Sequence, residues 1–262
     1  MAEGRRCLFC GKPAGSAEHV IAEWLSKAME KRDIGITRTN RQDGEVVREF
    51  PPIKFEHFRC KKVCHDCNTG WMHHLEDDFN LNFKELVIPR AFDDGEKVDS
   101  LIRNNWDTLV RWLLKTAIVC DAASGTTEHK IIPEIFYATE HLDINAHDFH
   151  VFAAEIMEDN VGYELNKQVK VSFPDSTSGY VIEDGTFLFL IQLNRLGLAL
   201  VHCPNYVPGF KSALGIMGKQ IVPISPSCSG FGGMSVMHLF FTIRLFHHSI
   251  TYFTKEQVAN NE

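Results

Sequence analysis

Two pairs of cysteines with the same spacing have the most clearly defined chemistry in the chain. Cys7 and Cys10 form the first pair, Cys64 and Cys67 form the second, and two residues separate the thiols of each pair. Four thiolates arranged as two knuckles complete the tetrahedral shell of a structural zinc ion. Cys60 is an alternative ligand, but its three-residue gap to Cys64 fits a knuckle less well, and buried free thiols are the other interpretation. We predict a closed zinc site formed by Cys7, Cys10, Cys64 and Cys67.

Two further groups close to these pairs carry side chains suited to hydrolysis. Glu18 and His19 lie between the pairs, where they offer a carboxylate for a metal ion beside a base that titrates near neutrality. Asn68 directly follows Cys67 and offers an amide oxygen. Each group has an ordinary alternative role, since a lone His near an apolar run is more often a core or surface residue and Asn commonly caps helices.

Two short motifs give these residues a common context. Glu-His-Val-Ile at 18–21 and Cys-Asn-Thr-Gly-Trp-Met at 67–72 resemble the HNH (ββα-metal) nucleases, and more narrowly a group of bacterial HNH-like proteins with an uncharacterised C-terminal domain. The resemblance covers residues 7 to about 80. It implies that His19 is the general base that takes a proton from the attacking water. It also implies that Glu18, in the family's Asp position, and Asn68 are ligands of a catalytic Mg²⁺ or Mn²⁺.

The sequence departs from the HNH pattern at one position. The family's middle Asn usually lies five residues before the first Cys of the second pair, where this chain has Arg59. Arg cannot brace a loop by accepting a backbone proton, although it can bind a phosphate, and His57 is a candidate substitute. Glu76 lies eight residues after Asn68 on the same predicted helix and is a candidate third ligand. We expect Glu76 instead to be a solvated helix residue.

Composition is that of a soluble globular protein with an uneven charge distribution. The chain has 262 residues, 44% hydrophobic and 23% charged, which disfavours wholesale disorder. Residues 1–75 carry 13 Lys and Arg against 10 Asp and Glu, a net charge of +3, so the remainder carries −10 of the total of −7. Affinity for DNA or RNA would therefore come from the zinc-bearing segment, unless this small excess is chance variation. We expect no membrane span, no export signal and a cytoplasmic location, where paired thiols bind metal.

The predicted elements of the first third place the candidate residues at the ends of a strand and a helix. A short extended piece ends at Glu18 and His19, and apolar spacing predicts a helix from there to residue 31. Residues 34–60 predict a β hairpin around Asn40–Gly44, followed by a strand at 54–59 that returns to the second knuckle. A helix with one apolar face begins near Asn68, and residues 79–97 predict a connection to a second domain.

The rest of the chain predicts one long helix and several strands. An apolar stripe predicts a helix at 98–122, and a shorter helix is expected at 131–141. Strands are expected at 149–156 and 169–173, and a hairpin at 186–203 turns at Asn194–Gly197. Residues 223–235 predict a loop, and the period of 236–246 fits either a helix or a strand. Cys120, Cys203 and Cys228 have no second cysteine at a metal-binding spacing, so we assign them no chemical role.

These observations predict an α+β protein with two domains. Residues 1–90 are expected to form an HNH-like nuclease module with structural zinc, and residues 98–262 a mixed α+β domain. The leading hypothesis is a metal-dependent endonuclease that hydrolyses phosphodiester bonds in DNA, with RNA a further candidate substrate, as a bacterial defence effector. The alternative is a zinc-stabilised nucleic-acid-binding module without catalysis. A third interpretation makes the acidic C-terminal domain a protein or ligand sensor that controls the nuclease. A protein partner or a second copy of the chain could bind through this domain.

Overall fold

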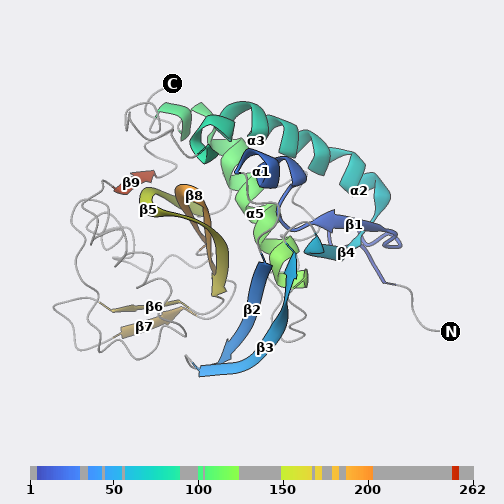
Figure 1. The fold of residues 1–262 in the computed structure, drawn as a ribbon, viewed down its shortest axis with the longest axis horizontal. Coiled ribbons are helices and arrows are strands. Elements are labelled where there is room, and N and C mark those ends of the chain that lie inside the picture. Colours follow the sequence, from blue (N-terminus) through green and yellow to red (C-terminus); the bar gives the residue numbers. More distant parts are fainter. Residues whose placement is uncertain are drawn as a thin grey trace.

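The computed structural model combines helices with small antiparallel sheets, as the α+β prediction requires (Figure 1). The residues it describes are 5–29, 35–42, 45–54, 57–88, 100–102, 104–123, 149–166, 169–172, 179–182, 187–202 and 250–253. Within these ranges, no helix has both the length and the apolarity needed to cross a membrane. The predictions for 131–141, 223–235 and 236–246 lie outside the described residues.

Two short strands and a short helix form the frame around Glu18 and His19. Strand β1 (Ser16–His19) pairs antiparallel with β4 (Arg59–Val63), and helix α1 (Glu23–Ala28) follows β1. Strands β2 (Gly35–Gln42) and β3 (Glu45–Lys54) form the predicted hairpin, which projects away from the helices (Figure 1). The predicted returning strand at 54–59 is wrong in position. It begins at Arg59 because β3 remains paired with β2 as far as Lys54.

The second cysteine pair opens two successive helices. Cys64 is the N-cap of α2 (His65–Thr69), and its sulfur accepts a hydrogen bond from the backbone N–H of Cys67. Gly70, with φ −93° and ψ −116°, ends α2 and precedes α3 (Trp71–Val87). The prediction that a linker begins at residue 79 is therefore wrong. Phe79, Phe83 and Val87 continue the apolar face of α3, so the helix extends for two more turns.

Close backbone contact at Gly70 gives a prediction for stability. A Cβ at this position would lie 2.5 Å from the carbonyl oxygen of Asp66, a backbone atom of α2 that cannot move without disturbing the helix. Gly70→Ala is expected to lower the free energy of unfolding by about 1–3 kcal/mol, the usual cost of overpacking. Gly15→Ala is the matched control, because no atom lies within 4 Å of its added Cβ. Urea denaturation that gave equal losses for both variants would contradict the expectation.

Helix α5 (Trp106–Ala123) is the centre of the core. It is buried on nearly all sides and contacts α3, β4, β5 and β8, and in Figure 1 it lies between the strand pair β1–β4 and the larger sheet. Its Trp112 stacks on Phe79 of α3 with ring centroids 3.9 Å apart. The predicted helix at 98–122 is divided, since 100–102 and 104 are helical and α5 begins at Trp106. One buried apolar cluster includes residues on both sides of 90–98, and the division into domains stays a prediction.

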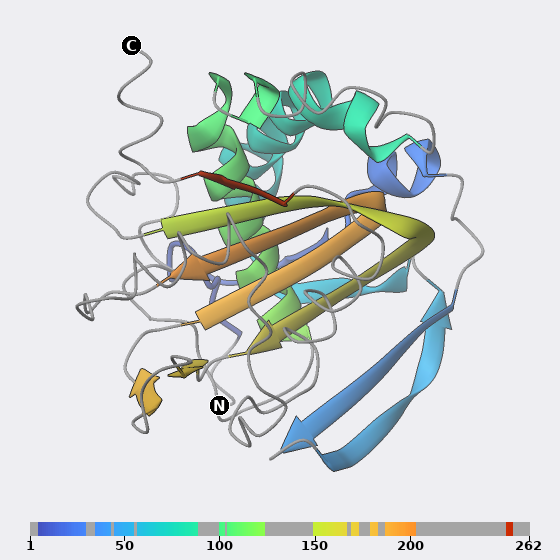
Figure 2. The ribbon, with the colours of Figure 1, turned by 90° about the vertical axis from the view of Figure 1, so that its left-hand side faces the viewer.

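The C-terminal sheet covers one side of α5. Its order is β8-β5-β9, with β5 (Phe149–Asn166), β8 (Phe187–His202) and β9 (Ile250–Phe253), while β6 (Val169–Ser172) pairs with β7 (Gly179–Ile182). The predicted hairpin at 186–203 is a single strand, β8. It pairs with β5 on both sides of the irregularity between Glu155 and Asn160, next to Asn194, which has φ 55°, and Figure 2 shows both β5 and β8 bending sharply. Asn tolerates this left-handed conformation, so the strand bends without losing its partner.

Candidate functional site

The four predicted zinc ligands come together in one cluster. The sulfur atoms of Cys7, Cys10, Cys64 and Cys67 all lie within 4.8 Å of one another, and the Cys10 and Cys64 sulfurs are 3.4 Å apart. Zn–S bonds of about 2.3 Å in a tetrahedron place sulfurs roughly 3.8 Å apart, so the arrangement fits. These four thiols can hold a zinc ion. Cys60 is buried but is not part of the cluster.

Backbone hydrogen bonds fix the first knuckle against β4. The amide of Cys7 donates to Lys12 at 2.7 Å, and the amide of Gly11 donates back to Cys7 at 3.0 Å. Gly11 has φ 71°, a left-handed conformation that Gly adopts without steric cost. The amide of Leu8 donates to the carbonyl of Lys62 on β4 at 3.0 Å. The two knuckles are therefore held together through the backbone, in addition to any ion that the four thiols could share.

The pKa values of three thiols in the cluster depart from the ordinary thiol value, in different directions. Burial raises the pKa of Cys10 and of Cys67 above the ordinary thiol value. At Cys64 burial is outweighed by hydrogen bonds from the backbone of Cys67 and from neighbouring thiols, and the pKa is lowered. Four adjacent thiolates repel one another unless a cation balances their charge. Zinc binding must therefore release protons, and its binding energy becomes folding energy.

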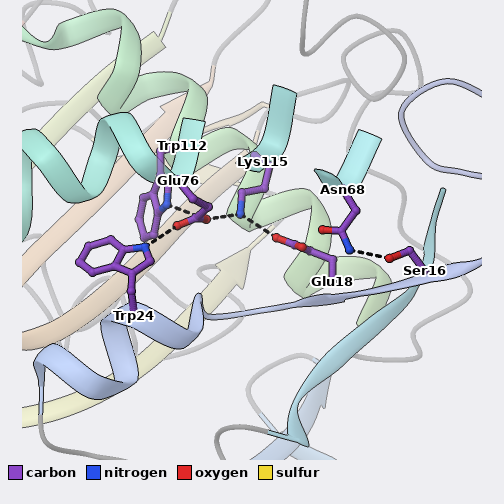
Figure 3. A network of polar contacts seen from close by, with 7 residues as sticks. All are labelled: Ser16, Glu18, Trp24, Asn68, Glu76, Trp112 and Lys115. Atoms are coloured by element: carbon purple, nitrogen blue, oxygen red, sulfur yellow. Dashed lines mark hydrogen bonds and ion pairs between the residues drawn. The ribbon is translucent and has the colours of Figure 1, made fainter. Parts of the chain in front are cut away.

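A buried ionic network lies beyond the zinc cluster, around Lys115 of α5 (Figure 3). The Lys115 ammonium donates to Oε1 of Glu18 at 3.1 Å and also to Oε1 of Glu76. Glu76 accepts two indole N–H groups, from Trp24 to Oε2 and from Trp112 to Oε1, both at 3.0 Å. Burial alone would lower the pKa of Lys115, but the carboxylates of Glu76 and Glu18 outweigh burial and raise it. Lys115 is therefore charged.

The position of Glu76 corrects one expectation, and Lys115 was not predicted at all. Glu76 is buried, with 8% of its surface exposed, so the prediction of a solvated helix residue is wrong. The reason is that α5 packs along α3 and covers this face. The signal that could have revealed Lys115 is its place in the run Trp112–Cys120, in which Thr116 is the only other polar residue. A lysine in such surroundings requires acidic partners.

Asn68 binds the strand that carries Glu18. Its amide nitrogen donates to the hydroxyl of Ser16 at 2.5 Å, and Ser16 lies two residues before Glu18 in β1 (Figure 3). The alternative role of Asn68 as a helix N-cap is wrong, because Cys64 caps α2 and Asn68 lies near its other end. The structure therefore brings Asn68 to β1 by a direct side-chain contact.

The remaining candidates lie on or beside the same strand pair. His19 is the last residue of β1, its side chain is half-buried, and its backbone is in register with Arg59 of β4. Arg59 and His57 are exposed. His19, the proposed base, is thus partly accessible to water and next in sequence to Glu18.

The chain matches no protein-family model, no curated protein and no solved structure. The four-thiol cluster is therefore the part of the resemblance to HNH nucleases that has independent support, and membership of that family stays a prediction.

Proposed function

We propose that the chain is a metal-dependent endonuclease of the HNH type that hydrolyses phosphodiester bonds in DNA. The observation that carries this proposal is the contact of Asn68 with Ser16 of β1, beside the four-thiol cluster. Strand β4 pairs antiparallel with β1 and is followed directly by α2, while α1, β2 and β3 lie between β1 and β4 in the chain. The contact joins the helix that carries Asn68 to the strand that carries Glu18 and His19. This order of elements supports the ββα-metal arrangement that the motifs imply.

The oxygen atoms of this arrangement fit a hard divalent cation. Glu18 uses Oε1 for Lys115, and no described residue donates a hydrogen bond to its Oε2. Asn68 uses its amide nitrogen for Ser16, and within the described ranges its Oδ1 accepts no hydrogen bond. Carboxylate and amide oxygens are ligands that Mg²⁺ and Mn²⁺ accept, with water and substrate phosphate completing the shell. Such a cation, when bound, stabilises the charge on the phosphate and on the departing oxygen.

The chain's own residues then divide the work of hydrolysis. The imidazole of His19 accepts a proton from the attacking water as the general base. Glu18 and Asn68 would hold the divalent cation, with phosphate among its remaining ligands. Exposed basic side chains on β4 and at the start of the first knuckle supply positive charge for the nucleic acid backbone, namely Arg5, Arg59, Lys61 and Lys62.

The same exposed basic residues favour a second candidate function, a zinc-stabilised nucleic-acid-binding module without catalysis. A module that only binds nucleic acid needs basic side chains but does not need Glu18, His19 and Asn68. The two candidates differ in whether a phosphodiester bond is broken. A role in bacterial defence and a sensor role for residues 98–262 stay predictions.

The test is incubation of the purified full chain, with zinc bound, with supercoiled plasmid, single-stranded DNA and RNA. We expect nicked or linear DNA in Mg²⁺ or Mn²⁺ and intact DNA without either ion, because the cation is part of the site. Gel shifts of the same substrates are measured in parallel. Binding without cleavage under all these conditions would reject the endonuclease in favour of the binding module, and cleavage of RNA alone would change the substrate class.

A further inference from the structure

The buried network around Lys115 joins the candidate metal ligand Glu18 to two helices. Lys115 belongs to α5, Glu76 to α3 and Glu18 to β1, so three segments far apart in sequence meet at one ammonium group (Figure 3). Its side chain is 1% exposed, and those of both carboxylates are 11% exposed. Lys115 is therefore shielded from substrate, and any influence on hydrolysis passes through Glu18.

The carboxylates of Glu76 and Glu18 differ in how many of their oxygens accept hydrogen bonds. Glu76 accepts one ammonium and two indole hydrogen bonds, so both of its oxygens are engaged. Glu18 accepts only the ammonium of Lys115 from the described residues, and through one oxygen. The second oxygen of Glu18 is not among the buried polar atoms of the described residues that lack a hydrogen-bond partner, so water can reach it. The second oxygen of Glu18 is therefore available to another ligand.

The net charge of the network also leaves Glu18 available to a cation. One ammonium and two carboxylates sum to −1, so one negative charge remains after Lys115 is neutralised. Without Glu76, Lys115 would neutralise Glu18 and stand as a positive charge beside any cation bound there. A buried ion pair contributes little net stability compared with apolar residues of the same volume, so stability alone does not explain the network.

We propose that Lys115 and Glu76 form a positioning pair for Glu18. Lys115 holds one oxygen of Glu18, and Glu76 balances the lysine, so that the second oxygen of Glu18 keeps its negative charge for a divalent cation. This inference rests on the proposed function, because it assumes that Glu18 is a ligand of that cation. Outer groups that orient and tune a metal ligand typically change metal affinity 10–100-fold when they are replaced.

The test is a titration of the full chain, with zinc bound, with Mn²⁺, in which free Mn²⁺ is followed by electron paramagnetic resonance. Glu76→Gln is expected to weaken Mn²⁺ binding about 10–100-fold while the zinc content stays at one ion per chain. Asp77→Asn is the matched control. It also removes one negative charge from α3, but Asp77 is exposed and pairs with His73, so wild-type affinity is expected. The double variant Glu76→Gln/Lys115→Met should bind Mn²⁺ more tightly than Glu76→Gln, because it lacks the unbalanced ammonium.

Each outcome of the titration decides a different claim. Wild-type affinity in Glu76→Gln, or a double variant no tighter than Glu76→Gln, would overturn the positioning pair. If Glu76→Gln does not fold, the double variant carries the test: a loss of Mn²⁺ affinity of about tenfold in a folded protein that keeps its zinc supports the pair, and wild-type affinity overturns it. Asn68→Ala separates this from the proposed function. No difference in Mn²⁺ binding between wild type and Asn68→Ala would overturn both claims, whereas a loss only in Asn68→Ala overturns the pair alone.

Discussion

Cys64→Ser is expected to give a destabilised protein that contains much less than one zinc ion per chain. A serine hydroxyl is not among the ligands that zinc takes in structural sites. Zinc bound by four thiolates contributes roughly 10 kcal/mol or more to folding. The substitution isolates the metal, because Ser is itself a favoured N-cap and can keep the hydrogen bond that Cys64 accepts from the amide of Cys67. Elemental analysis and thermal unfolding of the purified variant measure the two effects.

Cys60→Ser is the matched control for this experiment. It makes the same chemical change four residues earlier, at a buried thiol outside the four-sulfur cluster. We expect Cys60→Ser to keep one zinc ion per chain, with only the modest loss of stability that follows from burying a hydroxyl. Full zinc content in Cys64→Ser, or zinc loss in Cys60→Ser, would show that the ligand set has been assigned incorrectly.

His19→Ala is expected to lower the rate of DNA cleavage by about 10² to 10⁴, the usual contribution of a general base. The fold should remain, because β1 is held by backbone pairing with β4 and by the contact of Asn68 with Ser16. Zinc content and the melting temperature are therefore expected to stay near those of the wild type. The initial rate of plasmid nicking in saturating Mg²⁺ is the quantity to compare.

His73→Ala controls for the general loss of an imidazole near the site. His73 is exposed on α3, where it pairs with Asp77, and it takes no part in the proposed chemistry. We expect it to nick plasmid at the wild-type rate. A folded His19→Ala protein that cleaves as fast as the wild type would remove His19 from the mechanism and leave the metal-binding residues to be tested separately.

The features that the sequence predicts well are those determined by short spacing. The equal gaps between Cys7 and Cys10 and between Cys64 and Cys67 predict the thiol cluster, and apolar spacing predicts α1 and α3. The strand that returns to the second knuckle was placed too early, since the length of the β2–β3 pairing depends on partner contacts that local alternation does not specify.

The buried network is the feature that local patterns could not predict. Lys115 lies 97 residues from Glu18 and 39 from Glu76, so their contact depends on how α5 packs against α3 and β4. The sequence around Glu76 is compatible with a covered or an exposed helix face, so it does not predict whether Glu76 is buried. Only the mostly apolar run around Lys115, Trp112–Cys120, indicated that the lysine needs an acidic partner. The contact of Asn68 with Ser16 is equally non-local. The HNH-like motifs predict only that the segments that carry Glu18 and Asn68 lie at one site.

The central claim is that the chain cuts DNA with an exchangeable cation while a separate zinc ion holds the fold. The most direct measurement follows plasmid cleavage and zinc content in the same sample during brief exposure to a chelator. Closed thiolate shells release zinc more slowly than an open oxygen site releases Mg²⁺, so we expect cleavage to stop while one zinc ion per chain remains. Added Mg²⁺ or Mn²⁺ should restore it. Cleavage that persists with zinc alone, that declines only as zinc is lost, or that never occurs would contradict the claim.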